Sequence, residues 1–154
     1  MEPSTQTRKA ELTDLRRRRA ELRETMSALE SALAAPAVGR SVLWGELVHQ
    51  ALVDLADDFS DHIEVTEGPD GLHQAILAGA LRLANAVNAL AAEHATITAE
   101  IAALLRQTEP PVAPPAVEQA RERATRLLGR LIQHRQRGAD LIYEAYDTDI
   151  GGGD

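Results

Sequence analysis

Residues 117–145 read VEQARERATRLLGRLIQHRQRGADLIYEA. Small or apolar side chains recur in this stretch at alternating steps of three and four residues, which places them on one face of an α-helix. The positions on this face are Val117, Ala120, Ala124, Leu127, Leu131, His134, Gly138, Leu141 and Ala145. The stretch therefore predicts a long helix whose buried face contains one histidine, His134.

Three other stretches repeat this spacing, and a polar residue interrupts the apolar face of each. In chain order their positions are Leu12, Leu15, Arg19, Leu22, Met26, Leu29 and Leu33; Val48, Leu52, Leu55, Phe59 and His62; and Ile76, Ala80, Leu83, Val87, Leu90, His94, Ile97, Ile101 and Leu104. Four such helices bury these faces together in an all-α, up-down four-helix bundle. We therefore expect Arg19, His62, His94 and His134 to point inward, where polar groups need a partner or a metal.

Composition limits the fold and function classes. The chain has 154 residues, which suits a single domain, and no cysteine, which excludes disulfides and thiolate metal sites. A net charge of −8 argues against general nucleic-acid binding, which needs a basic surface. No apolar run in the sequence is long enough to span a membrane, and residues 1–10 contain no apolar segment of the kind found in a secretory leader. We therefore expect a cytoplasmic protein that acts on neither nucleic acid nor a membrane.

Breaking residues divide the chain into segments. Pro36 and Gly39 follow the first helix, a Gly-Pro-Asp-Gly turn occupies residues 68–71, and prolines fill residues 110–115. The expected bundle covers residues 7–146, with helices at about 7–34, 41–66, 72–105 and 116–146. Residues 1–6 and 147–154 are expected to be flexible ends.

The loop positions indicate which inward residues share a level in the bundle. Arg19 and His62 are equidistant in sequence from the break near Arg40, and His94 and His134 are equidistant from Pro114. His62 and His94 are centred on Ala78, well past the turn at 68–71. All four residues meet only if residues 68–80 are irregular or form a short separate helix. A straight helix from residue 72 would raise His94 about 25 Å above His62, at 1.5 Å per residue.

These residues resemble the hemerythrin-like (HHE cation-binding) family. The matching stretches are LRRRRAELRETMSALESAL in the first helix, DHIEVTEG with His62, AAEHATI with Glu93 and His94, and LIQHRQRGADLIYEAY with His134. The resemblance covers about residues 10–146 and implies an up-down bundle whose metal centre, usually two irons, is held by His, Glu and Asp from four helices.

Departures from the family pattern point to a reduced site. Arg19 stands where the first helix of the family has a histidine, and Thr66 and Gly138 stand four residues after His62 and His134, where the family has carboxylates. A guanidinium cannot ligate a metal because it stays protonated. We therefore expect no di-iron centre.

Arg19 is expected to take the place of the metal charge and to bond a carboxylate, with Asp58 as the first candidate. The expected central polar cluster is Arg19, Asp58, His62, His94 and His134. His49 and His73 do not follow the apolar spacing and are predicted to be surface residues.

Three interpretations of function remain open. The leading one is a non-enzymatic binding, sensing or interaction module that has reduced or lost its metal site and uses no cofactor. The second is a mononuclear iron or zinc protein, with redox or O2-related chemistry and the ligands His62, Glu67, His94 and His134. The third is a structural subunit whose inward polar residues fix helix register. The partner would be a protein or a small ligand, and a homodimer is compatible with the sequence.

Overall fold

The computed structural model describes the backbone of residues 5–148 and the side chains of residues 13–146. These residues fold into four long helices, α1 (Thr5–Ala34), α2 (Ser41–Glu67), α4 (Ala84–Gln107) and α5 (Val117–Ile142). Short helical segments fill the connections, and this part of the chain contains no β-strand. The all-α four-helix bundle expected from the spacing is confirmed.

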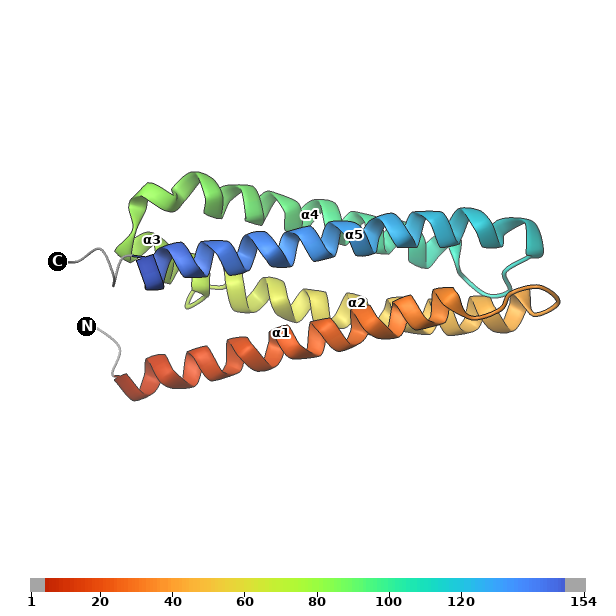
Figure 1. Cartoon of the computed structure of the whole chain (residues 1–154), viewed down its shortest axis with the longest axis horizontal. Helices are drawn as coiled ribbons and strands as arrows, with labels where there is room; N and C mark the ends of the chain where they lie inside the picture. The colour runs from red at the N-terminus through yellow and green to blue at the C-terminus, as the bar shows by residue number, and fades with distance from the viewer. Residues whose placement is uncertain (1–4, 149–154) are drawn as a thin grey trace.

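The helices run alternately up and down the long axis of the molecule (Figure 1). α1 packs on α2 and α5, and α4 packs on α2 and α5, so the four form a ring around one interior. Only residues 1–4 and 149–154 of the expected flexible ends lie outside the described residues. The rest of those ends is helical, since α1 begins at Thr5 and a π-helical turn continues α5 through Tyr143–Thr148.

The connection between α2 and α4 contains a separate short helix, as the level argument requires. α3 (Leu72–Gly79) ends at Ala80, whose backbone leaves the helical region with φ −147° and ψ 72°. A 3-10 turn, Leu81–Leu83, then leads into α4, and the chain bends by 113° at this break. The residues of α3 lengthen the connection between α2 and α4 without moving the start of α4 along the bundle axis. His94 therefore lies at the level of His62.

Two apolar clusters make up the interior. The larger one fills most of the bundle, from Trp44 near the loop after α1 to Phe59, and contains predicted leucine positions from each of the four long helices. The smaller one lies at the α3 end and consists of Ile76, Ala80, Leu83, Val87, Leu90 and Leu141. Each fully buried leucine or isoleucine stabilises the fold by about 1.5–3 kcal/mol relative to its exposed state. The histidines lie between the two clusters, in a frame held by apolar packing on both sides.

Hydropathy gives no single transmembrane candidate. None of the helices in residues 5–148 combines the length and apolar character of a membrane span, although the bent pair Ser41–Gly79 and Leu81–Gln107 passes by length and composition alone.

Candidate metal centre

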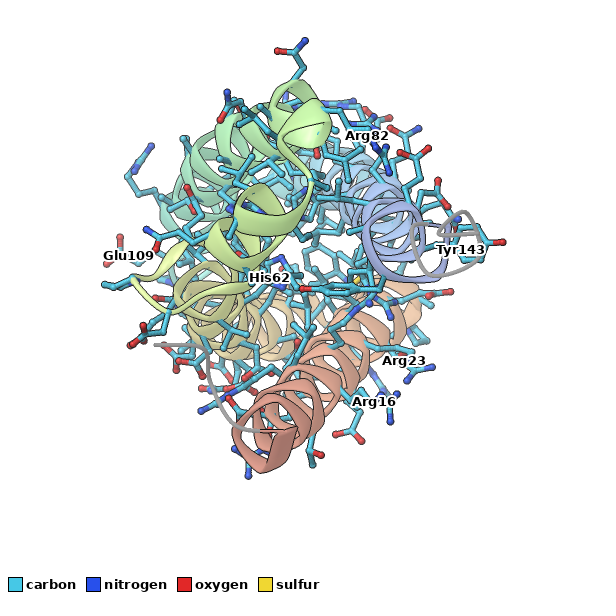
Figure 2. The ribbon with its side chains drawn as sticks, turned by 90° about the vertical axis from the view of Figure 1, so that its left-hand side faces the viewer. Arg16, Arg23, His62, Arg82, Glu109 and Tyr143 are labelled. Atoms are coloured by element: carbon cyan, nitrogen blue, oxygen red, sulfur yellow. The ribbon has the colours of Figure 1, made fainter. Side chains whose placement is uncertain are left out.

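Three histidines from three helices converge inside the bundle. His62 of α2, His94 of α4 and His134 of α5 are 9%, 2% and 3% exposed. The Nε2 atom of His134 lies 3.3 Å from that of His62 and 3.1 Å from that of His94. Figure 2, a view along the bundle from the α3 end, shows His62 near the middle of the four helices. One nitrogen of each ring lies within 4.8 Å of the others, which is close enough for a single metal ion.

Carboxylates lie behind two of the three rings. The Nδ1–H of His94 donates to Glu67 Oε2 over 2.5 Å, and the Nδ1–H of His134 donates to Glu93 Oε2 over 2.6 Å. Glu93 also forms an ion pair with Arg137. A neutral imidazole carries one proton, so a proton on Nδ1 leaves a lone pair on Nε2. The two carboxylates therefore select the tautomer in which His94 and His134 aim lone pairs at each other.

Burial keeps this cluster neutral. Desolvation, followed by the neighbouring His94 and His134, lowers the pKa of His62 to about 3. Burial lowers the pKa of His134 to about 4, and it also lowers the pKa of His94, although the hydrogen bond to Glu67 opposes that shift. Two lone pairs 3.1 Å apart repel unless a cation lies between or beside them. Because protons bind poorly here near neutral pH, a metal ion is the cation that this geometry suits.

His62 differs from the other two histidines. Its Nδ1 is buried and has no hydrogen-bond partner among the described residues. Its ring stacks on Phe59 at a centroid distance of 5.6 Å. Thr66, one turn later, donates its hydroxyl to the His62 carbonyl over 2.9 Å and so offers no donor to the site. No hydrogen bond at Nδ1 therefore fixes the tautomer of His62, and its Nε2 can carry either a proton or a lone pair.

Glu67 is not placed as the metal ligand that the sequence suggested. Its carboxylate lies on the Nδ1 side of His94, away from the three converging Nε2 atoms, because α2 ends at Glu67 beside α4. Glu67 therefore orients the ring of His94 instead of joining the three converging nitrogens. Glu93 has the same role toward His134, which the sequence analysis did not assign. The Glu93-His94 pair was visible in the sequence, but only the packing of α4 on α5 shows which histidine Glu93 serves.

His73 was predicted to lie on the surface, and this is wrong. It belongs to α3, is 7% exposed, and stacks on His94 with a centroid distance of 5.8 Å and an interplanar angle of 7°. Burial lowers its pKa. The error follows from the break at Ala80, which turns α3 across the end of the bundle and takes His73 out of the helical register of α4. His49 is half-buried and bonds the hydroxyl of Thr108 over 3.1 Å, far along α2 from the cluster.

The predicted bond between Arg19 and Asp58 does not form. Arg19 lines the cavity beside the histidines, as its place between Leu15 and Leu22 predicted. However, no described carboxylate forms an ion pair with it. Asp58 is half-buried at the contact between α1 and α2, where Thr25 is its polar neighbour. Asp58 therefore leaves the predicted polar cluster, and Arg19 remains in it without an anionic partner.

A small cavity of about 30 Å³ adjoins the histidines. Its polar lining residues are Arg19, His62, Thr66, His73, His94, His134 and Arg135, and its other lining residues are Leu15, Leu22, Leu72, Leu90, Gly138, Leu141 and Ile142. A Cβ atom at Gly138 would meet no heavy atom within 4 Å, so the missing carboxylate at this position leaves open space. The cavity has room for about two ordered waters, and an exogenous molecule bound beside the histidines would have to be small.

Comparisons with protein-family models, curated proteins and solved structures gave no match.

Proposed function

We propose that this protein is a helical metal-binding module that holds one divalent transition-metal ion through the Nε2 atoms of His62, His94 and His134. The observation that carries the proposal is the hydrogen bonding of Glu67 and Glu93 to the Nδ1 atoms of two of these rings. Metal-bound histidines characteristically donate their second ring N–H to a carboxylate or carbonyl, which fixes the tautomer and raises ligand basicity.

The nitrogen spacing supports a tetrahedral ion. Zinc–nitrogen distances of about 2.0–2.1 Å in tetrahedral geometry require nitrogens about 3.3–3.4 Å apart. The Nε2 separations of 3.3 Å and 3.1 Å from His134 to its neighbours come within a few tenths of an ångström of that spacing. The candidate ligand atoms of all three rings lie within 4.8 Å of one another, so side-chain rotations would be needed to bring the third pair to the same spacing. Three imidazoles suit zinc or iron(II), and they leave a coordination position open.

The mononuclear interpretation is better supported than a lost site. A degenerate site has no physical reason to keep three buried histidines with lowered pKa values and two carboxylates aligned behind them. A di-iron centre would need bridging carboxylates, and Thr66 and Gly138 stand where the hemerythrin-like pattern has carboxylates. We therefore propose a hemerythrin-like bundle with a single-metal site, whose role is to bind or sense a small ligand at the open position.

Metal analysis of protein purified without chelator tests this proposal. A single equivalent of iron or zinc per chain is expected, and His94→Ala and His134→Ala should each lose most of it. His49→Ala is the matched control because His49 lies outside the cluster, and it should retain the metal. Failure of zinc, iron(II) and cobalt(II) to bind the wild-type chain, or undiminished binding by the double variant, would exclude the site.

A further inference from the structure

Two arginines without anionic partners line the same cavity as the three histidines. Arg19 reaches it from α1 and Arg135 from α5. Neither forms an ion pair with a side chain in residues 13–146, and the Nε of Arg135 is buried without a hydrogen-bond partner. Both side chains are half-buried, and guanidinium groups removed from water normally pair with a carboxylate or phosphate, which matches their planar fork of donors. The two arginines therefore offer unused donors at the cavity.

The surroundings increase the positive charge at this side of the cluster. Arg23, which Figure 2 shows on α1, adds a like charge near both groups. Burial lowers the pKa of Arg19 and of Arg135, and the neighbouring arginines lower it further. The two carboxylates of the site lie behind the histidines, where Glu67 bonds His94 and Glu93 bonds His134.

Charge counting then gives an excess of positive charge around the cavity. Glu67 and Glu93 together would balance a divalent ion, so the charge of Arg137, which pairs with Glu93, already adds to the positive side. Arg19 and Arg135 remain uncompensated beside apolar walls that include Leu15, Leu72 and Leu90. An uncompensated charge in apolar surroundings is costly, and an anion in the cavity would relieve that cost.

We propose that the open position of the metal takes a small oxyanion of the formate, bicarbonate or nitrite class, held at the same time by Arg19 and Arg135. One oxygen would ligate the metal, and the oxygens would accept hydrogen bonds from the guanidinium groups. A cavity of about 30 Å³, with room for about two waters, admits only the smallest oxyanions and is too small for an aromatic acid. This inference rests on the proposed metal site and names the ligand class of that site.

Cobalt(II) provides the test, because its visible absorption bands change when its coordination changes. The wild-type protein is loaded with cobalt(II), its stoichiometry is measured, and sodium formate is then titrated at constant ionic strength. Formate should change the bands in a saturable manner, and sodium benzoate should not. Arg19→Gln and Arg135→Gln should weaken formate binding about tenfold or more, since each loses a charge-assisted hydrogen bond, while the cobalt stoichiometry stays that of the wild type.

Matched controls come from the same two helices. Arg16 of α1 and Arg130 of α5 are exposed and do not line the cavity, so Arg16→Gln and Arg130→Gln should bind formate as the wild type does. Arg19→Lys keeps the charge without the planar fork and should bind formate with intermediate affinity, which keeps the test valid if a glutamine variant does not fold.

The possible failures are distinguishable. If wild-type protein takes up no cobalt, the proposed metal site fails and this inference fails with it. If cobalt binds but formate leaves the bands unchanged, or benzoate binds equally well, the oxyanion site is wrong and the metal site stands. Wild-type formate affinity in Arg19→Gln and Arg135→Gln would also overturn the oxyanion site, because the anion would then need only the metal.

Discussion

Replacing His62 by leucine should stabilise the protein in the absence of metal. His62 is 9% exposed, and its Nδ1 has no hydrogen-bond partner among the described residues. Its Nε2 faces the Nε2 of His134 at 3.3 Å. A leucine of similar volume would fill the same space against Phe59 without a polar atom to satisfy. The folded chain therefore carries a cost at His62 that a metal ligand explains and a packing residue does not.

The structure gives the size of this cost. An unsatisfied buried polar group costs about 1–3 kcal/mol, and a neutral hydrogen bond such as that between His62 and His134 returns about 0.5–1.5 kcal/mol. The difference leaves His62→Leu about 0.5–1.5 kcal/mol more stable than the wild type. In a chain of this length, 1 kcal/mol moves the melting temperature by about 2–4 °C, so the expected rise is roughly 1–6 °C.

Denaturation in guanidinium chloride with excess chelator at pH 7.5 measures the difference, since His62 is then neutral in both states. His49→Leu is the control: His49 has a partner in Thr108, and its replacement should leave stability unchanged or lower it. A metal titration of the same samples should show no stabilisation of His62→Leu by zinc. If His62→Leu lowers the free energy of unfolding in chelator by 1 kcal/mol or more, the triad is a structural element and the reasoning is refuted.

Three further predictions concern the same cluster. The folded-state pKa values of about 3 for His62 and about 4 for His134 lie below the unfolded value of 6.5, so the unfolded chain binds more protons in acid. Metal-free protein should therefore keep its full stability above pH 6.5 and lose up to about 1.4 kcal/mol per histidine for each pH unit below it. Chemical denaturation across pH 4–7 measures this loss, and a flat profile would contradict the burial of neutral rings. Glu93→Gln should weaken zinc binding about 10–100-fold in a chelator competition, whereas Glu100→Gln, two turns further along α4, should bind zinc as the wild type does. If Glu93→Gln binds zinc with the affinity of the wild type, Glu93 does not support the site. Arg19→His should add a fourth imidazole, tighten zinc binding in the same competition and abolish the formate response of the cobalt protein; a retained response would show that the open position does not face Arg19.

The fold could be predicted because its determinants are local and repeated. The three-four spacing places leucines such as Leu22, Leu52 and Leu131 on one face of their helices, and these residues are buried as expected. The connection at residues 68–80 was predicted by counting, since His62 and His94 could share a level only with an excursion between them. The orientation of α3 could not be predicted, because it depends on how Ile76 and Leu83 pack against Leu141 at the other end of the chain.

The candidate site was only partly predictable for a related reason. Helical spacing shows that a side chain points inward, and this was enough for His62, His94 and His134. It does not show which neighbour an inward group meets across a helix interface. Glu67 was therefore predicted to be a metal ligand, whereas it accepts a hydrogen bond from the Nδ1 of His94. Arg19 was predicted to pair with Asp58, which lies at the contact between α1 and α2. The burial of His73 was not predicted because it depends on how α3 packs across the end of the bundle.

The two sides of the candidate site carry opposite charges. The carboxylates Glu67 and Glu93 lie behind His94 and His134, whereas Arg19 borders the cavity on the α1 side. A histidine at the position of Arg19 would let the protein itself complete the coordination. An arginine cannot do so, because it stays protonated, but it can hold an anion that does. Arginine at this position is therefore compatible with metal binding. It would transfer the last ligand from the protein to a small anion, and metal occupancy would then depend on the concentration of that anion.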